Sequence, residues 1–229
     1  MFNDNKYIWW RIAAFFRGTD ELSEIDRLVL FRVCKKWRSE FKMHLWVHPT
    51  LAYCKCLEVK NYRLANSIWD YSDDCIDCRD NRLVEAVAYY GTAMQITKML
   101  LREDFDPSCY DNLAVRCASE CGRADAVALL LNSDRVDPSA RNNYAIRFAS
   151  ERGHAEVVKL LLQDPRVDPA ARNNKAIRHA SRNGHTKVVA LLLQDNRVDP
   201  SAKHNYAIGW ASQNCHQDVL DLLFAKVLQ

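Results

Sequence analysis

The sequence predicts an all-α solenoid of stacked helix pairs, and three observations support this fold class. A 31-residue period recurs along most of the chain, and each period contains the pattern of two short amphipathic helices. Only six glycines and six prolines occur among the 229 residues. A period between about 20 and 50 residues is typical of solenoids, and the scarcity of glycine and proline disfavours a loop-rich β-protein.

The period is defined by residue types that recur at 31-residue steps. Four series carry it: Asp106-Pro107, Asp137-Pro138, Asp168-Pro169 and Asp199-Pro200; Asn112, Asn143, Asn174 and Asn205; Ala118-Ser119, Ala149-Ser150, Ala180-Ser181 and Ala211-Ser212; and Gly91, Gly122, Gly153 and Gly184. The glycine series begins one copy further upstream, so residues 81–101 are predicted to be a degenerate copy. The last copy, residues 197–229, carries Cys215 in place of the glycine.

Each copy predicts two helices separated by a break. In the copy that begins at Asp137, the residues at 145, 146 and 149 are small or apolar at helical spacing, which predicts a first helix over 144–150. Gly153 ends this helix, and a broad apolar stripe predicts a second helix over 156–162. The link 164–169 contains two prolines, which cannot continue a helix. Because so short a pair cannot bury its own apolar faces, we expect the copies to stack.

The repeated pattern A-S-x-x-G-H-x-x-V-V-x-L-L-L resembles the ankyrin repeat, whose usual form is A-A-x-x-G-H-x-x-V-V-x-L-L. The resemblance covers roughly the C-terminal two thirds of the chain. The usual T-P-L-H is replaced by Tyr144-Ala145-Ile146-Arg147 and its equivalents in the other copies. The period is two residues shorter than in the family, and the shortening lies in the connection that forms the family's β-hairpin finger. The resemblance implies recognition of other proteins without catalysis. It also implies a structural role at the start of the second helix for the recurring histidines His154, His185 and His216.

The first forty-five residues lack the period and contain two amphipathic helical segments. One interpretation is a cap that protects the first repeat. The other is that residues 7–41 resemble an F-box, because residues 26–38 read D-R-L-V-L-F-R-V-C-K-K-W-R, although Asn5-Lys6 replaces the usual opening Leu-Pro. That resemblance implies docking on a Skp-family adaptor of a cullin ubiquitin ligase. The residues expected to dock are Ile8, Ile12, Phe16, Leu28, Val33 and Trp37.

We therefore expect three regions. Residues 1–45 are the F-box-like or capping helices, residues 46–104 are degenerate ankyrin-like repeats, and residues 105–229 are the repeat array. Within the second region, residues 51–71 match a repeat only by their helical pattern.

Residues that vary at a fixed position of the repeat are the expected readers of a partner, because a solenoid presents them side by side. Two such positions are predicted to contact a protein target, one on the concave face and one at the fingers. The concave-face position carries Cys117, Phe148, His179 and Trp210, and the finger position carries Tyr110, Arg141, Arg172 and Lys203. Phe148 and Trp210 are the expected anchors, since large rigid side chains dominate binding hot spots. The alternative is that the first position packs partly against the next repeat.

Cysteine spacing suggests one alternative function, an enzyme with a zinc site. Cys54-x-Cys56 and Cys75-x-x-Cys78 have spacing that four-thiolate zinc sites use. However, Cys78 shares its repeat position with alanines such as Ala140, so we expect the cysteines to act mostly as small buried residues. No phosphate loop, nucleophile elbow or H-E-x-x-H motif is present. We expect no catalysis, cofactor or metal.

The charge balance does not identify a partner, with 32 basic and 29 acidic residues. Arg116, Arg147 and Arg178 form a ladder that could meet an acidic protein or a nucleic acid. Acidic residues interleave with this ladder and no aromatic series accompanies it, so we expect a solvated mixed-charge face and no nucleic-acid partner. We expect a monomer in the cytoplasm or nucleus, or in a host cell if the source is viral. No stretch has the roughly 18 apolar residues of a membrane span.

Overall fold

The computed structural model describes residues 80–228, which form ten helices and contain no strand. The helices are α5 (Asn81–Tyr90), α6 (Ala93–Leu100), α7 (Cys109–Glu120), α8 (Ala124–Leu131), α9 (Ala140–Arg152), α10 (Ala155–Gln163), α11 (Ala171–Arg182), α12 (Thr186–Leu193), α13 (Ala202–Gln213) and α14 (Gln217–Val227). The predicted all-α class is confirmed. The chain divides after Ala86 into two units, and the packing described below is that of residues 87–228. The expected F-box-like or capping segment and residues 51–71 lie outside the described residues.

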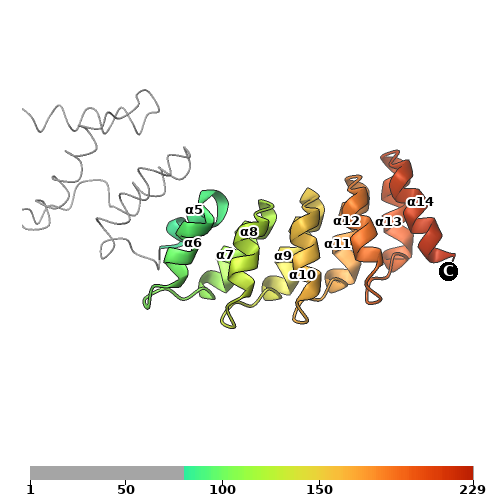
Figure 1. Cartoon of the computed structure of the whole chain (residues 1–229). Coiled ribbons are helices and arrows are strands. Elements are labelled where there is room, and N and C mark those ends of the chain that lie inside the picture. The colour runs from blue at the N-terminus through green and yellow to red at the C-terminus, as the bar shows by residue number, and fades with distance from the viewer. Residues whose placement is uncertain (1–79, 229) are drawn as a thin grey trace, which may run out of the picture. The chain divides into compact units, whose positions relative to one another are not determined.

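The helices of successive repeats form two layers (Figure 1). The first helices α7, α9, α11 and α13 pack each against the next, and so do the second helices α6, α8, α10, α12 and α14. From α7 onward, the second helix of each repeat also packs on the first. Every first helix therefore presents equivalent residues to its neighbours, and this arrangement places the variable positions in one row.

The core follows the predicted small and apolar positions. In α9, Ala145, Ile146 and Ala149 are completely buried, and in α10, Val158 and Leu161 are completely buried as well. Burying an aliphatic side chain of this size contributes about 1.5–3 kcal/mol. Alanines at the contacts between first helices leave little side-chain volume there, so the two backbones can approach closely.

A left-handed turn opens each first helix and was not predicted. Arg141, Asn142 and Asn143 have φ values of 53°, 58° and 58°, and the equivalent residues of α7, α11 and α13 repeat this conformation. The turn closes with a hydrogen bond of 2.6 Å from the Asn143 N–H to the Ser139 carbonyl. Left-handed backbone costs about 1–2 kcal/mol for each non-glycine residue. The described connections therefore contain this turn where the resemblance implied a β-hairpin finger.

Arginines of the same repeat stabilise this turn. In α9, Arg147 donates from Nε to the Asn142 carbonyl at 2.8 Å and from Nη2 to the Arg141 carbonyl at 3.0 Å. Arg116 and Arg178 make the equivalent contacts in α7 and α11. A guanidinium is well suited to this task because its donors lie in a fixed fork.

Asparagines of the turn connect one repeat to the next. The Asn143 side-chain carbonyl accepts the Asp168 N–H at 2.7 Å, and the same bond links Asn112 to Asp137 and Asn174 to Asp199. Asn143 is buried. The recurring asparagines therefore hold the Asp-Pro start of the following repeat in place.

Histidines form a second connection between repeats. His185 lies at the start of α12, and its Nε2 is 3.0 Å from the Glu151 carbonyl of the preceding repeat. His154 and His216 make the equivalent contact to the carbonyls of Glu120 and Arg182. The structural role that the resemblance implied for these histidines is confirmed.

The recurring glycines leave room for these histidines. Gly153 has a φ of +81°, and a Cβ built on it would lie 2.6 Å from Nδ1 of His185. Glycine therefore meets two requirements here: a left-handed backbone and space for the ring of the next repeat.

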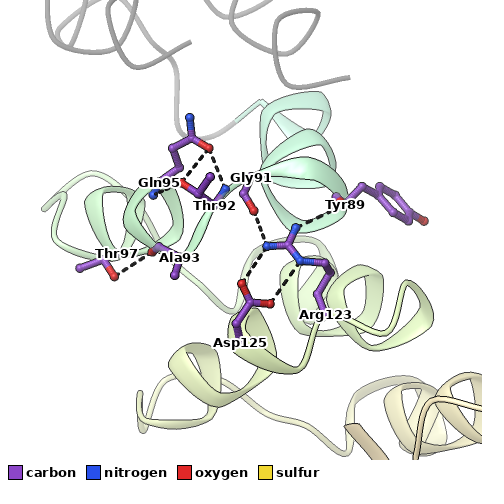
Figure 2. Close-up of polar contacts among 8 residues, drawn as sticks. All are labelled: Tyr89, Gly91, Thr92, Ala93, Gln95, Thr97, Arg123 and Asp125. Atoms are coloured by element: carbon purple, nitrogen blue, oxygen red, sulfur yellow. Dashed lines mark hydrogen bonds and ion pairs between the residues drawn. The ribbon is translucent and has the colours of Figure 1, made fainter. Parts of the chain in front are cut away.

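Arg123 replaces the histidine in the earliest described connection of this kind (Figure 2). Its guanidinium donates to the carbonyls of Tyr89 and Gly91 and is also paired with Asp125. Tyr89 occupies the repeat position of Glu120, so arginine reaches the same backbone carbonyl that histidine reaches in later repeats. Figure 2 also shows the capping box at the start of α6, formed by Thr92 and Gln95.

A third connection runs through the links between repeats. Arg166 donates from Nη1 to the Val136 carbonyl at 2.6 Å and from Nη2 to Asp164 at 2.6 Å. Arg197 makes the same contacts with Val167 and Asp195. Each of these arginines therefore forms hydrogen bonds both within its own link and to the link that precedes it.

Candidate protein-binding surface

The first helices carry a surface formed by two repeat positions, which we call the first-helix face. One position is the predicted anchor position, and the other lies four residues before it, on the same side of the helix. The two positions carry Leu113, Tyr144, Lys175 and Tyr206, and Cys117, Phe148, His179 and Trp210.

Aromatic side chains occupy this face in two pairs. On α9, the rings of Tyr144 and Phe148 stack with centroids 3.9 Å apart and planes at 14°. On α13, the rings of Tyr206 and Trp210 lie 5.5 Å apart. Phe148 and Trp210 are both half-buried. Rings held by a neighbouring ring lose little freedom on binding, which favours their use as anchors.

Helix α11 lies between the two aromatic pairs and contacts both of them. Lys175 places its Nζ 6.0 Å from the centroid of Phe148, within cation–π distance. On the other side, the His179 ring meets the ring of Trp210 edge-on at 5.8 Å. The structure therefore brings three of the predicted contact residues, Phe148, His179 and Trp210, onto adjoining helices.

Electrostatics define the protonation states on this face. Burial lowers the pKa of His179, and the positive charges of Lys175 and Arg178 lower it further. The carboxylate of Glu151, 3.0 Å from the His179 Nδ1, acts in the opposite direction, but the net shift of the pKa is downward. The His179 imidazole is therefore neutral at neutral pH and donates its Nδ1 proton to Glu151. Burial, with a hydrogen bond to Glu120, raises the pKa of Tyr144 to about 12. That phenol stays protonated and donates to the carboxylate at 2.8 Å.

The structure differs from the predictions at Cys117 and along the arginine ladder. Cys117 is only 6% exposed, so its thiol does not contribute to the surface. Arg147 and Arg178 are buried and bind backbone carbonyls, so the predicted solvated face is wrong at these two positions. Aromatic rings do accompany the ladder, since Arg116 lies 5.2 Å from the Tyr144 centroid.

The predicted finger residues lie at the first position of each left-handed turn. Tyr110, Arg141, Arg172 and Lys203 are all exposed. The Arg141 guanidinium pairs with the Asp111 carboxylate of the preceding repeat at 2.6 Å, and both side chains are more than half exposed. Such an exposed pair contributes little to stability, so its groups remain available to a partner.

Sequence reasoning missed five residues on or beside the first-helix face: Leu113, Tyr144, Lys175, Tyr206 and Arg182. The first four share one repeat position, four residues before the predicted anchors, and the combination of 31-residue register with helical spacing could have found them. Arg182 lies at the end of α11, where its guanidinium carbon is 5.6 Å from the Trp210 centroid. Its repeat position carries Glu120 and Glu151 in earlier copies, so no pattern marked it.

The described residues contain no group of three or more histidine, cysteine, aspartate or glutamate side chains that could hold a metal ion. The predicted zinc ligands Cys54, Cys56, Cys75 and Cys78 lie outside the described residues. No helix in the described part of the chain is long and apolar enough to cross a membrane.

The expectation of mostly buried cysteines is wrong for Cys121 and Cys215, which are exposed. Cys121 follows directly after the last residue of α7, and Cys215 takes the left-handed loop position of the glycines with a φ of 58°. Both lie just after the ends of first helices, α7 and α13. Cys117 is buried, as expected, and Cys109 is half-buried.

In a comparison with protein families, a family model described as ankyrin repeats in three copies matches the chain. It matches residues 83–173 and residues 146–228, which together exceed half of the chain. A comparison with curated proteins found no match.

Proposed function

The chain belongs to the ankyrin-repeat family, whose repeats form a protein–protein interaction module, and from this premise we propose that the first-helix face binds a target protein. The observation that carries the proposal is the half-buried pair Phe148 and Trp210, placed on either side of α11. Partly exposed aromatic side chains that are already held in place are typical anchors of protein interfaces. Tyr110, Arg141, Arg172 and Lys203 extend the proposed contact to the turns.

Selection from a display library of random peptides tests this proposal. We expect enriched peptides to bind the wild type, and the double substitution Phe148→Ala with Trp210→Ala to weaken binding by about 30-fold or more. Fluorescence polarisation measures the affinity. The matched control is Lys159→Ala with Lys187→Ala, two exposed side chains of α10 and α12, and it should leave affinity within about twofold. Unchanged binding by a folded Phe148/Trp210 variant would show that the target binds elsewhere.

We further propose that the array selects a substrate for a cullin-type ubiquitin ligase, with residues 7–41 recruiting a Skp-family adaptor. The V-C-K-K-W-R run at residues 33–38 supports this proposal. The alternative is a plain ankyrin scaffold or host-interaction protein whose residues 1–45 only cap degenerate repeats in 46–104 and the array in 105–229. Both assignments are intracellular, monomeric and without catalysis or cofactor.

A pull-down with a purified Skp-family adaptor separates these alternatives. We expect the full chain to retain the adaptor, and Trp37→Ala or Ile12→Asp to reduce the retained amount by about tenfold, because each removes an apolar docking side chain. Phe148→Ala serves as the control, since it should change target binding and leave adaptor retention as it was. Failure of the wild-type chain to retain the adaptor rejects the ligase proposal and favours the scaffold.

A further inference from the structure

Charge is distributed unevenly among the first helices. Across α9, α11 and α13 the only acidic side chain is Glu151, whereas α11 alone carries Arg172, Lys175, Arg178 and Arg182. The other acidic residues of these repeats lie in the links and on the second helices. The part of the first-helix face on α9, α11 and α13 is therefore basic, whereas α7 also carries Asp111 and Glu120, and the whole chain has a net charge of only +3.

Three of these cations lie beside the aromatic anchors, and we call Lys175, Arg178 and Arg182 the basic strip. Arg178 and Arg182 each place the guanidinium carbon 5.6 Å from the Trp210 centroid, and Lys175 lies near Phe148. The single negative charge of Glu151, whose carboxylate accepts a hydrogen bond from His179, offsets only one of the three positive charges of the strip. Lys175 is half-buried and Arg182 is exposed, so both ammonium and guanidinium groups can meet a ligand.

We propose that the basic strip recognises an acidic segment of a partner polypeptide. Carboxylates of this segment would bind Lys175 and Arg182, and its flanking apolar side chains would pack on Phe148 and Trp210. This inference rests on the proposed function, since it names the chemistry of the partner that the first-helix face takes.

The ring geometry favours a polypeptide over a single-stranded nucleic acid. Nucleic-acid platforms need a free ring face on which a base can stack. Tyr144 and Phe148 stack on each other at 3.9 Å, and Arg178 and Arg182 lie close to Trp210. Carboxylates need no free ring face, and the exposed Arg182 and half-buried Lys175 are accessible to them.

A fluorescein-labelled random copolymer of glutamate and tyrosine is the probe that tests this proposal. We expect the full chain to bind it, and affinity to fall about tenfold between 50 and 300 mM salt, because salt screens exposed charges. Lys175→Glu with Arg182→Glu should weaken binding about tenfold or more. Lys175→Gln with Arg182→Gln should give a smaller loss of affinity, because it removes the positive charges without adding negative ones. The control Lys159→Glu with Lys187→Glu makes the same change of net charge on α10 and α12, and it should change affinity by less than about threefold.

Three results would overturn the proposal: no binding of the copolymer, an equal loss in the control variant, or tighter binding of a lysine–tyrosine copolymer or of oligodeoxythymidylate. These outcomes are distinct from failure of the proposed function. If display-selected peptides bind through Phe148 and Trp210 while the acidic copolymer does not, the protein-binding surface stands and only its acidic preference is rejected.

Discussion

Replacing Gly153 with alanine is expected to lower the free energy of unfolding by about 3 kcal/mol. The left-handed backbone at this residue, with φ of +81°, costs an L-residue about 1–2 kcal/mol. The new Cβ would also lie 2.6 Å from the ring of His185, and relieving that overlap adds about 1–3 kcal/mol. Urea denaturation followed by circular dichroism measures the change.

Cys215 provides the matched control, because it occupies the same repeat position with φ of 58° and is exposed. Cys215→Ala should change the free energy of unfolding by less than about 0.5 kcal/mol, and Cys215→Gly should raise it by about 1 kcal/mol. In a double-mutant cycle, His185→Ala should recover part of the loss in the Gly153→Ala background, since the overlap is removed. Additive effects in this cycle would mean that the histidine ring does not set the cost.

Replacing Asn143 with alanine is expected to lower the free energy of unfolding by a similar amount, about 3 kcal/mol. The substitution leaves the Asp168 N–H without its acceptor at 2.7 Å, which costs about 1–3 kcal/mol. Alanine also tolerates the left-handed φ of 58° less well than asparagine, at a cost of about 1 kcal/mol. Because the broken contact joins two repeats, the denaturation midpoint should fall and the transition should lose cooperativity.

Asn205 lies at the same position of the last described repeat, with φ of 61°, and is exposed. Asn205→Ala should therefore lower the free energy of unfolding only by the cost of placing alanine in the left-handed conformation, about 1 kcal/mol. Equal losses at Asn143 and Asn205 would show that the bond to the following Asp-Pro start contributes nothing measurable.

The sequence predicted the second helices well because a local pattern determines them. The stripe of valines and leucines between 156 and 162 lies inside α10 (Ala155–Gln163), and the glycine at 153 ends the preceding helix. Both signals depend only on residues within one or two helical turns. The family match from residue 83 to residue 228 agrees with the repeat pattern on which the prediction rested.

The start of the first helices could not be predicted in the same way. Arg141-Asn142-Asn143 reads as a polar loop, and three successive left-handed residues have no propensity signal, since each is unfavourable by itself. Their conformation depends on Arg147, six residues after Arg141, and on a partner in the next repeat, 25 residues after Asn143. The sequence showed that these arginines and asparagines recur, but it could not show what they bind.

The candidate surface could be predicted only in part, because some of its features depend on contacts with other repeats. Phe148, His179 and Trp210 stood out because their repeat position varies, and the structure brings them onto adjoining helices. The burial of Cys117 and the contribution of Arg182 depend on contacts between helices, so neither followed from a single position of the repeat.

The three connections between repeats have a consequence for how the gene can change. Every connection joins the same two positions in each pair of neighbours, so excision of residues 137–167 would leave Asn112 facing Asp168, His185 facing the Glu120 carbonyl and Arg197 facing the Val136 carbonyl. Each of these new pairs has the same chemistry as the pair it replaces. Recombination can therefore shorten or lengthen the array by whole 31-residue cassettes at any breakpoint, and the length of the recognition surface can evolve separately from its stability.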